Sequence, residues 1–101
     1  MATDGDETPT GFGSFDFDPQ KDHVNQDKHG ISLNAAAELE PLAYVDDLRF
    51  EEPRFRVYGT IDGLAYCVAG MRRDGRVRVI SLRRAHAKEM RRYVERGTGP
   101  E

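Results

Sequence analysis

The sequence contains no tryptophan, one cysteine and no long hydrophobic run. The single cysteine, Cys67, excludes an intramolecular disulfide and any multi-cysteine zinc or iron–sulfur site. It lies in the short apolar run 64–68, which predicts a small buried strand residue rather than a reactive thiol. Such runs are far shorter than the ~20 residues of a membrane helix, and no basic-then-apolar start marks a secretory signal. With 101 residues, we expect one small cytoplasmic domain that does not contact a membrane.

Several catalytic motifs are absent as well. The chain has no glycine-rich phosphate loop, no dinucleotide-binding glycine turn and no serine nucleophile elbow. Its three histidines, His23, His29 and His86, do not have the spacing of metal ligands. We therefore expect neither a metal site nor a cofactor.

Basic residues are missing from the start of the chain and concentrated in its second half. Residues 1–18 hold five acidic and no basic residues, whereas residues 54–101 hold five acidic and twelve basic ones. The net charge of −3 conceals this asymmetry. All of these twelve cations except Lys88 are arginines, which can donate two hydrogen bonds to one phosphate. The pattern favours a polyanionic ligand; a solvated face and an acidic protein partner are the alternatives.

Turn residues and capping residues divide the first half of the chain. Residues 1–14 are small, polar and acidic, which is typical of a disordered leader, so the domain is expected at 15–96 with a disordered tail at 97–101. The expected elements are a strand at 15–17, a helix at 19–29 and a second short helix at 32–40. Asp18 is a suitable N-cap for the first helix, Gly30 ends it, and Pro41 ends the second.

In the second half of the chain, apolar and polar residues alternate, as is typical of β-strands. The expected elements are strands at 54–58, 64–70 and 76–82 and a helix at 85–96. The pairs Asp62-Gly63 and Asp74-Gly75 predict tight hairpin turns between the strands. The sequence therefore predicts an α+β domain of order β-α-α-β-β-β-α, with a small antiparallel sheet and helices on one side of it.

Alternation also predicts which side chains share a face of this sheet. Phe55 and Val57 should face the helices, which leaves Arg54, Arg56 and Tyr58 on the opposite face. Arg76 and Arg78 of the last strand should point the same way. Guanidinium groups, a phenol and a few carboxylates can cleave RNA without a metal, because the RNA supplies its own 2′-hydroxyl as nucleophile.

Two motifs carry a family resemblance. The first is Lys28-His29-Gly30 followed by Ser32, and the second is Ser81-Leu82-Arg83-Arg84-Ala85 followed by Glu89 and Tyr93. In this order and spacing, over about residues 15–94, they resemble the BrnT family, the toxins of type II toxin–antitoxin pairs. The resemblance implies a RelE/ParE-like fold and a metal-independent endoribonuclease that inhibits translation.

The resemblance and the arginine pattern together define the expected site. The expected catalytic residues are Arg54, Arg83, Lys28, Tyr93 and Glu52. The expected RNA-binding residues are Arg56, Arg76, Arg78, His29 and Arg84. Alternative roles are a helix-capping charge for Lys28 and His29 and a core position for Tyr93. Glu89 is expected to orient an arginine.

The chain departs from the family pattern near Arg54. The family commonly has a glutamate directly before this arginine, whereas this chain has Pro53 there and Glu52 one place earlier. A second hypothesis is therefore a catalytically weakened interaction module of the same fold that binds an antitoxin or RNA. The resemblance further implies a BrnA-like ribbon-helix-helix antitoxin, two toxins for each antitoxin dimer, and contact with DNA only through that partner.

Overall fold

The computed structural model describes residues 14–95. The expected tail 97–101 and all but the last residue of the expected leader 1–14 lie outside the described residues. The elements in chain order are β1 (Phe15–Asp16), α1 (Pro19–His29), the 3₁₀ helix η3 (Leu33–Glu38), β2 (Glu40–Asp47), β3 (Arg54–Ile61), β4 (Leu64–Arg73), β5 (Arg76–Arg84), α2 (Ala87–Met90) and the π-helical turn η4 (Arg91–Glu95).

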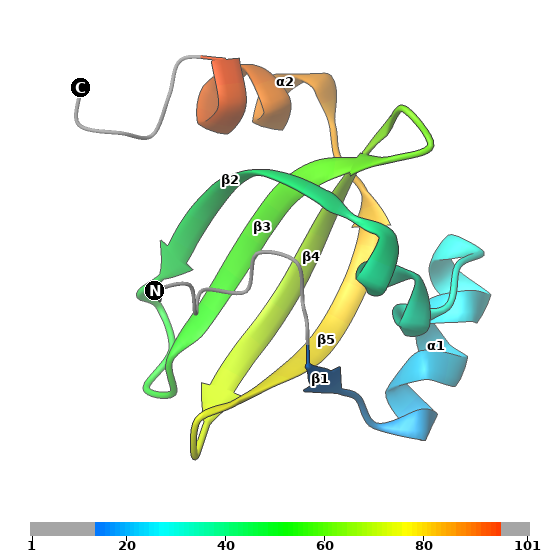
Figure 1. Cartoon of the computed structure of the whole chain (residues 1–101), viewed down its shortest axis with the longest axis vertical. Helices are drawn as coiled ribbons and strands as arrows, with labels where there is room; N and C mark the ends of the chain where they lie inside the picture. Colours follow the sequence, from blue (N-terminus) through cyan, green and yellow to red (C-terminus); the bar gives the residue numbers. More distant parts are fainter. Residues whose placement is uncertain (1–13, 96–101) are drawn as a thin grey trace.

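A twisted five-stranded sheet forms the centre of the molecule (Figure 1). Its strand order is β1-β5-β4-β3-β2, and the three pairs formed among β2 to β5 are antiparallel. The two residues of β1 pair with β5 in parallel, so the sheet is mixed. The α+β class is confirmed, as are the two hairpin turns, where Asp62 and Gly63 have φ values of 52° and 78°. Positive φ at both central positions is the geometry of a type I′ turn.

Strand β2 is an element that the sequence did not predict. The second helix was expected to reach Glu40, but η3 ends at Glu38 and the chain then turns into β2. Proline cannot donate a ladder hydrogen bond, which argued against a strand at Pro41. The sheet accepts Pro41 because β2 is an outermost strand and its register shifts between Pro41 and Ala43.

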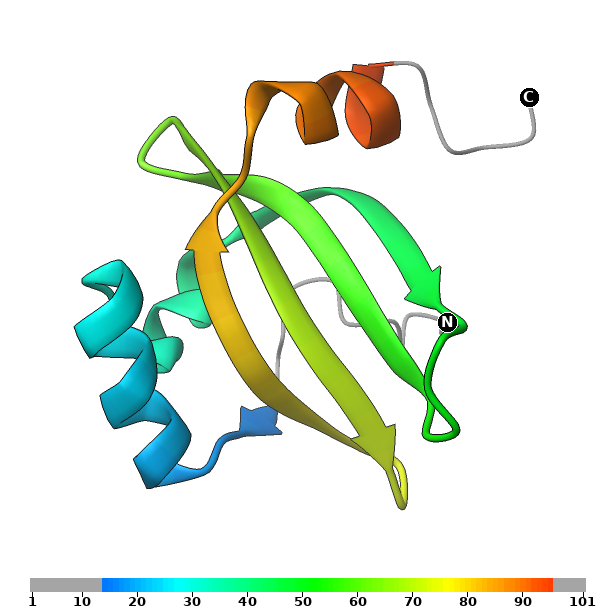
Figure 2. The same ribbon diagram turned by 180° about the vertical axis from the view of Figure 1, so that it is seen from behind.

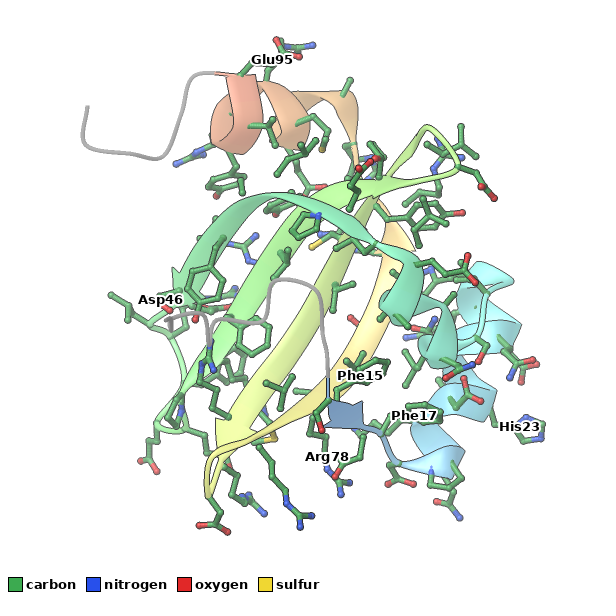
Figure 3. The ribbon with its side chains drawn as sticks, in the orientation of Figure 1. Phe15, Phe17, His23, Asp46, Arg78 and Glu95 are labelled. Carbon is green, nitrogen blue, oxygen red and sulfur yellow. The ribbon has the colours of Figure 1, made fainter. Side chains whose placement is uncertain are left out.

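Helix α1 lies along the β5 edge of the sheet (Figures 1 and 2). Both expected caps are present: the Asp18 side chain accepts from Gln20 N, and Gly30 is left-handed with φ 73°. Asn25 attaches the helix to the strand, because its amide group donates to Leu82 O (2.8 Å) and accepts from Leu82 N (3.1 Å). This side chain supplies hydrogen bonds to the β5 edge where β1 does not reach. His23, in contrast, projects from α1 away from the sheet (Figure 3).

The core lies between η3 and one face of the sheet. Its completely buried members are Leu33, Ala36, Val68 and Leu82, with Phe55, Val57 and Val79 almost as deeply buried. Phe15 and Phe17 pack against this core from the β1 side (Figure 3). The expected inward orientation of Phe55 and Val57 is therefore confirmed.

The C-terminal helix occupies the other face of the sheet, unlike the expected arrangement with all helices on one side. Tyr93 of η4 stacks on Tyr58, with ring centroids 5.0 Å apart and an interplanar angle of 11°. Tyr58 alternates with Val57 along β3, so it belongs to the face opposite the core. It is nevertheless 0% exposed, because this helix covers it. Sequence periodicity shows that a helix is amphipathic but does not show which sheet face it covers.

Candidate nucleic-acid interface

The face opposite the core carries most of the strand arginines. Residues that pair directly across strands point to the same face of a sheet. The three rows across β3, β4 and β5 are Tyr58 with Cys67 and Arg83, Arg56 with Ala69 and Ser81, and Arg54 with Met71 and Arg78. One further pair, Arg73 with Arg76, extends this face toward the β4–β5 turn. We call it the basic face; its arginines are Arg54, Arg56, Arg73, Arg76, Arg78 and Arg83.

A β-bulge in β5 brings Arg83 onto the basic face. Strict alternation from Arg78 would place Ile80, Leu82 and Arg84 on this face. Instead Gly70 pairs with Val79 and Ala69 pairs with Ser81, so Ile80 is one extra residue in β5. The shift directs Leu82 into the core and Arg83 to the basic face.

A groove of about 250 Å³ lies in the middle of the basic face. Cys67, Ala69 and Ser81 line it between the longer side chains of Arg56 and Arg83. Because the middle row has an alanine and a serine beside Arg56, the surface is hollow there. The groove is therefore surrounded by guanidinium groups from β3 and β5.

Two of these arginines each have a buried Nε donor without a hydrogen-bond partner. The Nε atoms of Arg54 and Arg56 are buried and have no hydrogen-bond partner among residues 14–95. Both arginines line the groove. Buried donors are normally satisfied, and a charged donor without an acceptor is especially costly. A phosphate oxygen in the groove would be an acceptor for such donors.

Arg83 is held by a carboxylate from the C-terminal helix. Its Nη1 and Nη2 donate to the two carboxylate oxygens of Glu89 at 2.9 and 2.8 Å. These bonds lower the pKa of Glu89 to about 2 and raise the pKa of Arg83 above its usual range. Glu89 is thus ionised at neutral pH and has the orienting contact with an arginine that the sequence predicted.

Tyr58 links this ion pair to a second arginine. Its hydroxyl donates to Glu89 Oε2 (3.2 Å) and accepts from Arg56 Nη1 (2.8 Å). Burial is the main reason that the pKa of Tyr58 lies above its ordinary value. The Arg56 guanidinium also lies 5.3 Å from the centroid of the Tyr93 ring. Glu89, Tyr58 and Tyr93 together therefore fix the positions of the Arg83 and Arg56 side chains.

Glu52 lies at the other end of the basic face. Its carboxylate is 3.5 Å from Arg54 Nη2 and 3.4 Å from Arg73 Nη2. The Arg54 guanidinium also stacks on the Phe50 ring, 4.0 Å from its centroid. The loop that carries Pro53 therefore does bring Glu52 to Arg54, although a proline intervenes.

The structure brings together seven of the ten expected site residues and leaves three elsewhere. Arg54, Arg56, Arg76, Arg78, Arg83, Glu52 and Tyr93 belong to the basic face or contact one of its arginines. Lys28 and His29 are exposed at the end of α1, beside the β5 edge. Arg84 pairs with Tyr66 on the opposite side of β5 from Arg83, where its guanidinium lies over the Tyr66 ring and donates to Ala65 O.

Sequence reasoning missed Arg73, Asp47 at the end of β2, and the loop residues Arg49 and Phe50. Arg73 could have been found, because a two-residue turn at Asp74-Gly75 pairs it directly with Arg76. The other three residues gave no such signal. Asp47 is held by Arg49 through two hydrogen bonds of 2.8 and 2.7 Å, which lower its pKa to about 2.

Cys67 is 2% exposed and burial raises its pKa, which confirms the predicted buried strand residue. Residues 14–95 contain no cluster of three or more side chains suited to holding a metal ion. No helix in this range is long and apolar enough to cross a membrane.

The fold and the site define a class: a small α+β domain with an arginine-rich sheet face suited to a polyanion. A family model described as the ribonuclease toxin BrnT of type II toxin–antitoxin systems matches residues 17–89. The chain therefore belongs to the BrnT family, and this membership implies an RNA substrate and an antitoxin partner.

Structural comparison supports the same fold. The crystal structure of the Brucella abortus ribonuclease toxin BrnT superposes with a TM-score of 0.54 at 22% sequence identity. The match covers 72% of this chain and 99% of that one. A search among curated proteins gave no match. The RelE/ParE-like α+β fold that the family resemblance implied is confirmed.

Proposed function

We propose that this protein is a metal-independent endoribonuclease that cleaves RNA through the 2′-hydroxyl and thereby inhibits translation. The observation that carries the proposal is the groove of the basic face, where the buried Nε donors of Arg54 and Arg56 have no acceptor within residues 14–95. A phosphodiester in this groove would accept from both arginines and would lie beside Arg83. Guanidinium groups would then provide the positive charge that a metal ion provides in other nucleases.

The proposed reaction is an internal transesterification. The 2′-oxygen forms a bond to the adjacent phosphorus as it loses its proton, and the bond from phosphorus to the 5′-oxygen breaks as that oxygen gains a proton. The products end in a 2′,3′-cyclic phosphate and a 5′-hydroxyl. Negative charge grows on the phosphoryl oxygens in between, and we assign Arg54 and Arg83 to stabilise it.

The proton-transfer roles fall to groups at the two ends of the face. Glu52 lies beside Arg54, so we assign it as the acceptor of the 2′-hydroxyl proton. Tyr93 lies beside Arg56, and we assign its hydroxyl to the leaving 5′-oxygen. Glu89 is a positioning residue, because Arg83 occupies both of its oxygens and keeps its pKa at about 2. Lys28 lies at the end of α1 and contacts none of the arginines of the basic face, so we assign it no part in this step.

The remaining arginines are assigned to the RNA on either side of the cleaved bond. Arg78 lies across β4 from Arg54 and makes an ion pair with Asp16 at 3.0 Å, and Arg76 continues the basic face toward the β4–β5 turn. These two arginines would hold flanking phosphates through charge rather than through base recognition. His29 and Arg84 lie outside the basic face.

The antitoxin is proposed to be BrnA-like, with a ribbon-helix-helix part that dimerises and binds DNA. Such a dimer would carry two toxin copies, and the toxin would reach DNA only through it. An acidic part of the antitoxin that covered the basic face would block the groove.

Two observations favour the alternative of a catalytically weakened module. Both Nη atoms of Arg83 are engaged by Glu89, and Nη1 also donates to Arg84 O (3.1 Å). Pro53 also replaces the carboxylate expected directly before Arg54. In this reading, the basic face binds an antitoxin or RNA without cleaving it.

The two readings are separated by one experiment. Purified protein is incubated with labelled RNA in excess EDTA, and the fragment ends are identified by mass spectrometry. The first reading expects cleavage with 2′,3′-cyclic phosphate ends, and Arg54→Ala serves as the inactive control. Cleavage that disappears in EDTA and returns with magnesium would contradict the proposed mechanism, whereas RNA binding without any cleavage would support the alternative.

A further inference from the structure

The outermost strand β2 and the loop after it expose an apolar surface that the proposed ribonuclease site does not use. Leu42 is 55% exposed, Tyr44 36%, Leu48 89% and Phe50 42%. Isolated exposed apolar residues are common, but these four belong to one strand and its adjoining loop. Three of them, Tyr44, Leu48 and Phe50, line one groove.

Part of this surface is concave. A groove of about 340 Å³ lies between β2 and the loop, and its apolar lining includes Tyr44, Leu48, Phe50, Pro53 and Phe55. We call it the β2 groove. The rings of Tyr44 and Phe55 stack at its base, with centroids 5.6 Å apart. Such a groove accepts aliphatic or aromatic side chains of an inserted segment.

The charges around the β2 groove are acidic, in contrast to the basic face. Asp46, Glu51 and Glu52 line it, and Asp46 lies at the end of β2 (Figure 3). The two arginines of the lining, Arg54 and Arg72, lie over the Phe50 and Phe55 rings respectively. Among the ion pairs of residues 14–95, Glu52 takes part, but Asp46 and Glu51 do not. These two free carboxylates disfavour RNA and favour a segment that carries lysine or arginine.

The backbone of β2 adds a third element of recognition. Within residues 14–95, β2 pairs with β3 on one side and no strand pairs with its other side. An outer strand edge presents backbone N–H and C=O groups that can pair with an extended chain.

We propose that an extended segment of the antitoxin pairs with the outer edge of β2. Apolar side chains of the segment enter the β2 groove, and its lysine or arginine side chains contact Asp46 and Glu51. This inference rests on the toxin–antitoxin partnership of the proposed function, but not on catalysis. It assigns the antitoxin two contacts of opposite charge: a basic and apolar anchor at β2 and an acidic cover over the basic face.

The two contacts are adjacent. Asp47, Phe50, Arg54 and Phe55 line both the β2 groove and the groove of the basic face. A segment anchored beside Phe50 thus lies next to Arg54, which is assigned to the scissile phosphate. Anchoring at β2 places the following part of the antitoxin at the entrance of the RNA site.

The test measures antitoxin binding by variants of the anchor. The probe is the protein encoded by the adjacent reading frame, purified and titrated into the full toxin chain by calorimetry. Leu48→Ala removes an exposed side chain and should raise Kd at least tenfold without affecting the fold. Asp46→Lys combined with Glu51→Lys should raise Kd at least tenfold at low salt and less at high salt.

Matched controls lie elsewhere on the surface. Leu64 is 46% exposed at the β3–β4 turn, and Glu38 is exposed at the end of η3. Leu64→Ala and Glu38→Lys should bind the antitoxin within about twofold of the wild type.

Each other outcome would overturn the inference. Anchor variants that bind as tightly as the controls would exclude the β2 edge, and so would a wild-type toxin that does not bind the probe. If Leu48→Ala weakened RNA binding and left antitoxin binding unchanged, the β2 groove would be assigned to RNA. RNA cleavage by the free toxin is assayed separately, so a toxin that fails to cleave but shows the expected binding pattern refutes the proposed ribonuclease and not the anchor.

Discussion

Replacement of Glu89 by glutamine tests how the C-terminal helix is attached to the sheet. The carboxylate accepts two hydrogen bonds from Arg83, one from Tyr58 and one from the backbone N–H of His86. Glutamine keeps the size and one acceptor oxygen but removes the charge. We expect Glu89→Gln to destabilise the fold at neutral pH, and we expect this effect to depend on pH in a defined direction.

The magnitude follows from the pKa. Chiefly through Arg83, the pKa of Glu89 falls from 4.5 to about 2. A carboxyl pKa lowered in the folded state stabilises the protein above the ordinary pKa, and this stabilisation is lost as the pH falls from about 4.5 toward 2. At about 1.4 kcal/mol per pKa unit the full shift corresponds to about 3 kcal/mol. Glu89 and Arg83 are 21% and 30% exposed, so solvent screening reduces the expected value to about 2 kcal/mol.

The assay is urea unfolding of the wild type and of Glu89→Gln at several pH values. At pH 7 the midpoint should fall by roughly 1–2 M, given ~1–3 kcal/mol/M for a domain of this size. The difference between the two proteins should shrink by more than half at pH 3. At that pH the Glu89 carboxyl of the unfolded wild type is protonated, so the ionised carboxylate of the folded state contributes less to the free energy of unfolding. A difference that stays constant from pH 7 to pH 3 would refute the reasoning, since it would show that the charge of Glu89 is not what stabilises the helix.

Further predictions concern the groove, the flanking arginines and the sheet. Arg83→Ala and Arg54→Ala should each reduce kcat/KM for RNA cleavage by about 10²–10³, and lysine at either position should restore little because a single ammonium group cannot reproduce the guanidinium fork; full activity of the alanine variants in a cleavage assay would reject the assignment. Arg76→Gln should reduce the salt dependence of RNA binding by about 0.7 in the slope of log K against log salt, measured by fluorescence anisotropy, and an unchanged slope would show that Arg76 contacts no phosphate. Gly59→Ala should destabilise the fold by about 2–3 kcal/mol in urea unfolding, because the new Cβ would lie 2.2 Å from Glu40 O of the neighbouring strand; a neutral result would mean that β2 can move away from β3.

Local signals were sufficient to predict most of the elements. The caps Asp18 and Gly30 marked helix α1, and the aspartate-glycine pairs marked both hairpin turns, because each of these residues acts on its immediate neighbours. Strand β2 had no comparable signal. It alternates, but its proline and its two aspartates are tolerated only because it is an outer strand with a register shift, and both are properties of the assembled sheet.

The candidate site could be predicted only where it depends on the alternation of side chains along a strand. The outward orientation of Arg54, Arg56 and Tyr58 needed only the side-chain period of a strand. The contact between Glu52 and Arg54 could not be derived, because it depends on the path of a loop. The position of Lys28 could not be derived either, because a family resemblance does not show where the end of a helix lies relative to the sheet.

The extra residue at Ile80 makes the site more sensitive to chain length than to side-chain chemistry. Every residue of β5 after Ile80 has its orientation determined by that one insertion. A deletion of a single residue there would exchange Leu82 and Arg83, placing a guanidinium in the core and an aliphatic chain in the groove. Substitutions along β5 can therefore accumulate one at a time and be selected individually, whereas an insertion or deletion between Arg78 and Arg83 changes the core and the site together. In laboratory evolution of this protein, libraries with point changes in β5 should yield folded variants, and libraries with single-residue deletions there should yield almost none.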